Sequence, residues 1–199
     1  WYNDDNTYSV NQEGCYYSKY EARDLLKTFV KKFKGSDLDK KGVKVSMFES
    51  GSMEGDDSSC AAYMDCILGR GPKYVFKNAK LRKYFNEVSM HSYWSSADTK
   101  KNAESYFADK YSKYSIAATE YCQMTDDKNT GVYDLISKEK NGTNGTSIKY
   151  GVAMANTIID DLTIMNASEW DWWTACSYGT YTDGLIYLDK DNHENLDFS

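Results

Sequence analysis

Segments with helical periodicity alternate with short extended segments along most of the chain, and this alternation restricts the folds available to it. Strands separated by helices are joined by right-handed crossovers, so the pattern predicts an α/β fold with a parallel sheet. The predicted helices span residues 20–33, 58–68, 78–84, 99–111, 131–138 and 147–165. The predicted strands span residues 42–49, 88–94, 115–120 and 184–188.

The ends of the clearest helices are marked by specific residues. The apolar spacing of 20–33 stops at Gly35, a residue typical of helix termination. The longest helical pattern, 147–165, starts at the N-cap residue Ser147. Its apolar positions are Ile148, Val152, Ala155, Ile158, Ile159 and Leu162.

A barrel and a doubly wound sheet both fit this order of elements. No GxGxxG or GxxxxGK[ST] motif follows a predicted strand, which removes the usual evidence for a nucleotide-binding doubly wound sheet. Acidic and aromatic residues stand at the strand ends, which form the active face of a (β/α)8 TIM barrel. We therefore expect part of such a barrel, with these residues at its active face: Glu49, His91, Tyr93, Trp94, Glu120 and Tyr121.

Composition and charge exclude several classes of partner and ligand. The net charge is −6 and the basic residues are scattered, so we expect no nucleic-acid partner. No apolar run approaches the roughly 20 residues of a membrane helix, which predicts a soluble chain without a membrane span. The five cysteines lack CxxC spacing, so neither a metal site nor any other cofactor is predicted.

Glu120 is the strongest candidate for chemistry. It ends a strand of small and apolar residues, 116–119, so its carboxylate is expected to be partly desolvated at the mouth of the barrel. The structural alternative is a carboxylate paired with a basic neighbour. Glu49 occupies the equivalent position of an earlier strand and is the rival within the chain for a second carboxyl group.

Aromatic residues accompany these acids. The chain has 18 Tyr and 5 Trp against 7 Phe, and rings with a polar group suit sugar-binding clefts as well as ordinary cores. His91, Tyr93 and Trp94 are able to bind sugar hydroxyls and stack on a pyranose, although His91 equally fits a structural role. The segment 170–173 holds three indoles, and at least one of them is expected to line a cleft.

The order and spacing of three motifs closely resemble strands five to eight of the glycoside hydrolase family 30 barrel. Within that family, residues 12–15 and 175–187 are most similar to endo-β-1,6-galactanase-like members, and the resemblance extends from residue 1 to about residue 189. The motifs are His91-Ser92-Tyr93-Trp94, Ala118-Thr119-Glu120-Tyr121 and Trp170-Asp171-Trp172-Trp173-Thr174-Ala175.

The resemblance implies a secreted or cell-surface retaining enzyme that cleaves a polysaccharide through two carboxyl groups about 5–5.5 Å apart. β-1,6-Galactan is the substrate of the most similar members, while β-glucanase, xylanase and glucosylceramidase activities remain open. Glu120 matches the family's catalytic nucleophile. The residues expected to bind substrate are His91, Tyr93, Trp94, Tyr121, Trp172, Trp173 and Glu49.

One feature of the family pattern is missing. The family's acid/base Glu stands in an Asn-Glu-Pro motif at the end of strand four, and the chain, whose only proline is Pro72, lacks that motif. We therefore expect the acid/base residue upstream of Trp1. Residues 1–199 would be the C-terminal half of a catalytic barrel, partnered by the remainder of that barrel and by a β-sandwich side domain.

Half a barrel leaves open sheet edges and an unfilled interior. We therefore expect residues 1–199 alone to be poorly soluble and inactive. The alternative from another functional class is a non-catalytic carbohydrate-binding remnant, in which the aromatic residues bind sugar and no acid is present.

Overall fold

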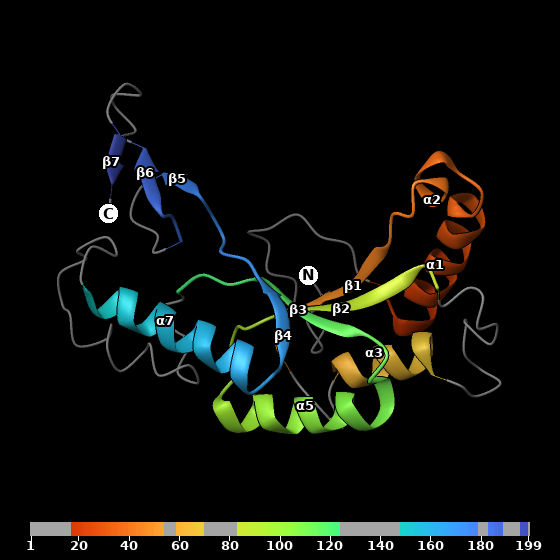
Figure 1. Cartoon of the computed structure of the whole chain (residues 1–199), viewed down its shortest axis with the longest axis horizontal. Coiled ribbons are helices and arrows are strands. Elements are labelled where there is room, and N and C mark those ends of the chain that lie inside the picture. The colour runs from red at the N-terminus through yellow and green to blue at the C-terminus, as the bar shows by residue number, and fades with distance from the viewer. Residues whose placement is uncertain are drawn as a thin grey trace.

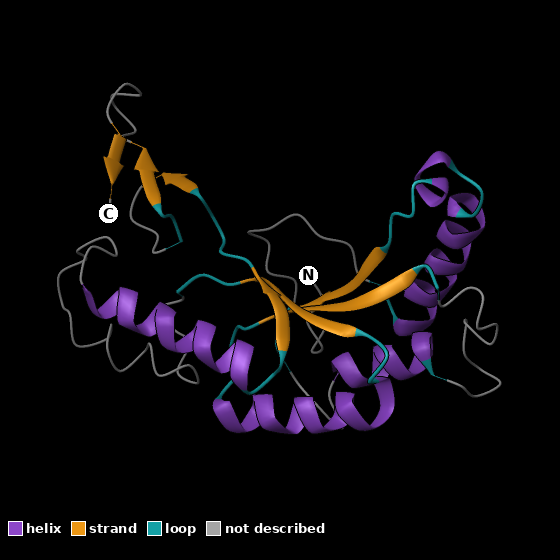
Figure 2. Cartoon of the chain, in the orientation of Figure 1, coloured by secondary structure: helices purple, strands orange, loops and turns teal. Residues whose placement is uncertain are grey.

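The central feature of the computed structural model is a four-stranded parallel sheet (Figures 1 and 2). The structure describes residues 17–53, 59–69, 83–123, 148–178, 183–188 and 196–198. The strands are β1 (Val45–Ser50), β2 (Phe85–His91), β3 (Ser115–Glu120) and β4 (Ala167–Trp170), in the order β1-β2-β3-β4. Each strand pairs with the one before it in the chain, as in part of a (β/α)8 barrel, and the predicted α/β class is confirmed.

Helices connect and cover these strands. In Figure 1, α3, α5 and α7 lie along one side of the sheet, while α1 and α2 precede β1. The predicted helices 20–33, 58–68, 99–111 and 147–165 are confirmed to within two residues at each end, whereas 131–138 and most of 78–84 lie outside the described residues. The helices are α1 (Lys19–Phe33), α2 (Asp37–Lys40), α3 (Ser59–Leu68), α5 (Ala97–Tyr111) and α7 (Ile148–Thr163).

The assignment of residues 184–188 as a further strand of the main sheet is wrong. The fourth strand is β4, which the sequence did not reveal because it has only four residues and little apolar content. Residues Ile186–Leu188 instead form β6 of a second sheet, between β5 (Cys176–Tyr178) and β7 (Leu196–Phe198). β6 pairs in parallel with β5 and antiparallel with β7, so this small sheet has mixed topology.

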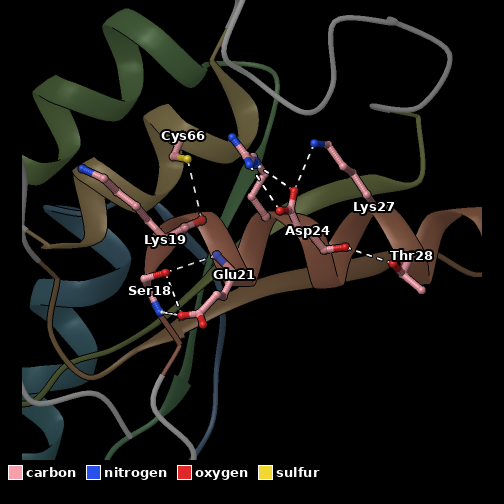
Figure 3. A network of polar contacts seen from close by, with 8 residues as sticks. Ser18, Lys19, Glu21, Asp24, Lys27, Thr28 and Cys66 are labelled. Atoms are coloured by element: carbon pink, nitrogen blue, oxygen red, sulfur yellow. Dashed lines mark hydrogen bonds and ion pairs between the residues drawn. The ribbon is translucent and has the colours of Figure 1, made fainter.

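Hydrogen bonds fix the start of α1, and a glycine follows its end. Ser18 Oγ accepts from the Glu21 amide at 3.3 Å, and the Glu21 carboxylate accepts from the Ser18 amide at 2.9 Å, which makes a capping box (Figure 3). The Cys66 thiol on α3 donates to the Lys19 carbonyl at 3.7 Å and joins the two helices. The helix ends at Phe33 as predicted, and Gly35 follows with φ 79°, a conformation that favours glycine.

The hydrophobic core lies between the sheet and helices α1, α3 and α5. Val88 and Met90 of β2 and Ile67 of α3 are at most 1% exposed, and Phe33 of α1 packs edge-on against Tyr84 with ring centroids 5.6 Å apart. Burial of such side chains contributes roughly 1.5–3 kcal/mol each to folding. Packing of this core sets the position of β2, whose C-terminal end carries His91.

A buried ion pair joins the helix layer to the strand ends. Lys100 Nζ of α5 lies 2.8 Å from Asp161 Oδ1 of α7, and both side chains are at most 2% exposed. The same carboxylate accepts hydrogen bonds from Ser92 Oγ at 2.8 Å and from Trp170 Nε1 at 2.9 Å. Ser92 follows β2 and Trp170 ends β4, so Asp161 fixes both of these strand exits against α7.

The outward face of α7 is more apolar than its buried face. The side chains buried against β4 and α5 are Tyr150, Ala153, Thr157 and Asp161. Four of the apolar residues that predicted this helix are instead exposed, on the face of α7 opposite its buried side. They are Ile148, Val152, Ile159 and Leu162, at 80%, 49%, 55% and 43% exposure. No helix among the described residues is long and apolar enough to cross a membrane.

Breaking the buried ion pair should destabilise the fold strongly. We expect Lys100→Met to lower the free energy of unfolding by about 3–5 kcal/mol, because it leaves the Asp161 carboxylate without its cation. Lys101→Met is the matched control, since Lys101 pairs with Asp98 at 3.8 Å on the exposed side of the same helix and should change stability by less than about 1 kcal/mol. Urea denaturation of both variants measures the difference, and equal effects would contradict the assignment.

Introducing charged residues on the exposed apolar face of α7 should improve solubility without loss of stability. We expect Ile159→Lys with Leu162→Glu to change the free energy of unfolding by no more than about 0.5 kcal/mol, because both side chains are exposed. The protein remaining in solution after centrifugation should increase. Ala153→Glu, on the buried face, should instead unfold the chain. Unchanged solubility of the double variant would show that the exposed apolar face of α7 does not drive association.

Candidate active site

Parallel pairing brings the predicted strand-end residues to one edge of the sheet. His91 of β2 is in register with Glu120 of β3, and Met90 of β2 is in register with Ser50 of β1. The register shifts between Phe48 and Ser50, where Glu49 adopts φ 58°, so β1 is bulged at its acidic residue. Bulges and left-handed backbone at non-glycine residues are concentrated at functional sites, where they redirect a side chain.

His91 lies between the two carboxylates of this edge. The imidazole is 5% exposed, with Nε2 3.1 Å from Glu49 Oε2 and Nδ1 3.7 Å from Glu120 Oε1. Thr119 Oγ1 also donates to Glu49 Oε2, at 2.5 Å. Three strands thus contribute to one polar cluster made of Glu49, His91, Thr119 and Glu120, and the predicted convergence of the two acids with His91 is present in the structure.

The hydrogen bonds of this cluster keep Glu49 ionised. The hydrogen bond from His91, followed by those from Thr119 and Ser89, lowers the pKa of Glu49 from 4.5 to about 2 against the opposing effect of burial. A lowered folded-state pKa means that the stabilisation from Glu49 is complete above about pH 4.5 and is lost as the pH falls towards 2. At neutral pH, Glu49 is a carboxylate.

Glu120 is the less exposed of the two acids, and a tyrosine donates to it. Its side chain is 17% exposed, against 55% for Glu49. Tyr93 Oη donates to Glu120 Oε1 at 3.1 Å and lies 3.5 Å from Cys122 Sγ. Burial, together with these neighbours, raises the pKa of Tyr93, so the phenol keeps its proton and remains a donor to Glu120.

Cys122, next to this pair, is a poor nucleophile. The thiol is buried beside Tyr93, and burial raises its pKa to about 11. Because the thiolate is the reactive form of cysteine, a neutral buried thiol serves packing. Among the side chains of this edge, Glu120 combines partial burial with an oriented hydrogen-bond donor.

A cluster of aromatic rings adjoins the two acids. Tyr121 is fully buried and stacks on Tyr93 with ring centroids 5.6 Å apart. It also makes a T-shaped contact with Trp172, with ring centroids 6.1 Å apart, and the Trp172 indole donates to the Asp183 carbonyl at 2.8 Å. The buried Tyr121 ring therefore packs against both Tyr93 and the half-buried Trp172.

Two tryptophans present exposed rings beside this cluster. Trp94 is 41% exposed and lies 5.6 Å from Tyr93, while Trp173 is 53% exposed and follows Trp172 directly. Exposed indoles on a wall of buried aromatic residues are able to stack on the flat face of a sugar ring. The predicted substrate-binding residues thus form one connected set of contacts around Glu120, which Trp173 joins through its amide, a donor to the Tyr121 carbonyl at 2.9 Å.

The sequence model of O-glycosyl hydrolase family 30 matches residues 2–187. This match spans nearly the whole chain, including all four strands of the main sheet and the entire set of candidate residues. The chain belongs to glycoside hydrolase family 30. Comparison with curated protein sequences gave no match. The family assignment makes the protein a glycoside hydrolase with a carbohydrate substrate.

Three functional features of this family 30 site were not foreseen from the sequence. Thr119 holds the Glu49 carboxylate, and Ser89 Oγ accepts the Glu49 amide at 3.2 Å. Ser92, within the His91–Tyr93 motif, donates to Asp161. Alternation along β2 could have found Ser89, which lies two residues from both Glu87 and His91, whereas no such signal marks Thr119. Within the described residues, no three His, Cys, Asp or Glu side chains gather as a metal site.

Removing the Tyr93 hydroxyl should destabilise the site specifically. We expect Tyr93→Phe to lower the free energy of unfolding by about 1.5–3 kcal/mol, because the buried phenol donates to a carboxylate. Tyr20→Phe, at a ring that is 53% exposed on α1, should change it by less than about 0.5 kcal/mol. Thermal unfolding of the two variants measures the difference, and a neutral Tyr93→Phe would mean that the hydrogen bond to Glu120 is not formed in solution.

Proposed function

We propose that this glycoside hydrolase is a retaining, endo-acting β-glycosidase in which Glu120 is the nucleophile. The observation that supports this role is the placement of Glu120 at the end of β3, with its carboxylate oriented by the protonated Tyr93 and adjacent to His91. A nucleophile must be aimed at the reacting carbon and partly desolvated, and these contacts support both requirements.

The chemistry follows from the position of this carboxylate. A Glu120 oxygen attacks the anomeric carbon as the glycosidic C–O bond breaks, and a general acid protonates the departing oxygen. The acid, now a base, then removes a proton from water, which attacks the same carbon and releases Glu120. Trp94, Trp172 and Trp173 stack on the sugar rings, while His91 and Tyr93 line the subsite of the reacting sugar.

Glu49 is unsuited to the role of general acid. Such a group must carry a proton near the operating pH, and a pKa of about 2 leaves Glu49 without one. We therefore place the general acid on a strand preceding β1 in a (β/α)8 barrel to which residues 1–199 contribute strands five to eight. The sequential parallel order β1-β2-β3-β4 supports this placement.

The proposed substrate is a plant-type polysaccharide of the β-1,6-galactan type, cleaved outside the cell. Support for this choice comes from the resemblance of residues 12–15 and 175–187 to endo-β-1,6-galactanase-like members. The exposed rings of Trp94 and Trp173 are available to stack on further sugars of a polymer.

Substitution of the nucleophile tests the proposal. In the complete barrel, Glu120→Gln should lower kcat by about 10⁴-fold or more while oligosaccharide binding stays nearly unchanged, because the amide keeps the shape but cannot attack carbon. Azide should restore turnover to Glu120→Ala and yield the glycosyl azide of inverted configuration. Glu169→Gln, at an exposed acid of β4, is the control and should remain active. Retained activity of Glu120→Gln would exclude Glu120 as the nucleophile.

A further inference from the structure

Glu49 has an unusual backbone for an acidic side chain at a strand end. It stands at a bulge of β1 with φ 58°, which L residues rarely adopt, and its amide donates to the fully buried Ser89 Oγ at 3.2 Å. The bulge turns its carboxylate towards β2 and β3, since Oε2 receives His91 Nε2 at 3.1 Å and Thr119 Oγ1 at 2.5 Å. Hydrogen bonds therefore hold both the backbone and the carboxylate of Glu49 in place.

The contacts of His91 indicate what this arrangement of Glu49 does. An ionised carboxylate only accepts hydrogen bonds, so the contact with Glu49 places a proton on Nε2 of the imidazole. The opposite ring nitrogen, Nδ1, then faces Glu120 Oε1 at 3.7 Å. When the ring carries its second proton, the Nδ1–H group points at the nucleophile.

The surroundings of His91 leave the ring one orientation. Glu49 comes from β1, Glu120 from β3, and the Tyr93 ring stands edge-on to the imidazole with centroids 5.8 Å apart and an interplanar angle of 81°. Tyr93 in turn donates to the same Glu120 oxygen that faces His91. Turning the imidazole about its axis would remove the hydrogen bond to Glu49 and direct carbon instead of nitrogen at Glu120.

We propose that Glu49 is a positioning residue for the nucleophile: its carboxylate accepts the Nε2–H group of His91 and thereby directs Nδ1 towards Glu120. This inference rests on the proposed role of Glu120 and assigns Glu49 to orientation of the site in place of direct sugar binding. Thr119 and Ser89 support the same function, because they hold the carboxylate and the backbone of Glu49.

The two histidines of the chain, His91 and His193, make a direct test possible. In the complete barrel labelled with ¹⁵N-histidine, the ring signals of His91 are identified by their loss in His91→Gln, and those of His193 serve as the internal reference. The wild-type His91 ring should show the Nε2–H pattern and a contact with the Tyr93 ring. In Glu49→Ala, the Nδ1–H form should rise and the contact with Tyr93 should weaken.

Two further variants separate positioning from loss of structure. Glu49→Gln keeps an acceptor oxygen and should restore most of the Nε2–H form, while Thr119→Val should shift the ring in the direction of Glu49→Ala by a smaller amount. Glu169→Ala, at the exposed acid of β4, should leave both histidines unchanged. Amide spectra establish that each variant is folded. A His91 ring that is unchanged in Glu49→Ala, or protonated on Nδ1 alone in the wild type, would overturn the proposal.

Kinetics of the complete barrel give a second readout. Glu49→Ala should lower kcat by roughly 10- to 100-fold with little change in KM, as for other residues that orient a reacting group, and Glu49→Gln should recover part of this loss. A raised KM with unchanged kcat would instead assign Glu49 to substrate binding. Because the histidine signals need no turnover, they remain decisive for Glu49 even if Glu120→Gln retains activity and the proposed function fails.

Discussion

Parallel pairing of β1, β2 and β3 is the constraint on which the site depends. Glu49 and His91 are 42 residues apart in the chain, yet their side chains lie 3.1 Å apart because parallel strands end at the same edge. The buried face of the sheet fixes this register, since Val88, Met90 and Ala118 are almost fully enclosed by the core. The chemistry of the edge is thus held in place by apolar packing beneath it.

Two polar networks hold the strand-end residues in place. One is internal to the edge and joins Glu49, His91 and Glu120. The other is more deeply buried. There Asp161, paired with Lys100, accepts a hydrogen bond from Ser92, the residue between His91 and Tyr93. Buried polar groups of this kind are expensive to leave unsatisfied, so they favour a single arrangement of the strand exits. Orientation of Glu120 is therefore a property of the helices as well as of its own strand.

Much of the architecture could be predicted from local pattern. Helical spacing located α1, α3, α5 and α7, and the strand 115–120 agrees with β3 at both ends. β4 was missed because Ala167–Trp170 is short and mostly polar, so burial by α7 and β3 decides its conformation. Residues 186–188 looked like another barrel strand because their composition is apolar, although strand composition does not say which sheet a strand joins.

The sequence by itself determined the family, the α/β alternation and the candidacy of Glu120, because strand-end acids and motif order are local properties of the chain. Only the tertiary structure decided the contacts of Glu49 and the buried face of α7. Whether a strand-end carboxylate is an acid, a nucleophile or a positioning group depends on its pKa and neighbours, which come from other strands. Likewise, the apolar spacing predicted α7, but its packing against β4 and α5 selected Ala153, Thr157 and Asp161 as the buried face.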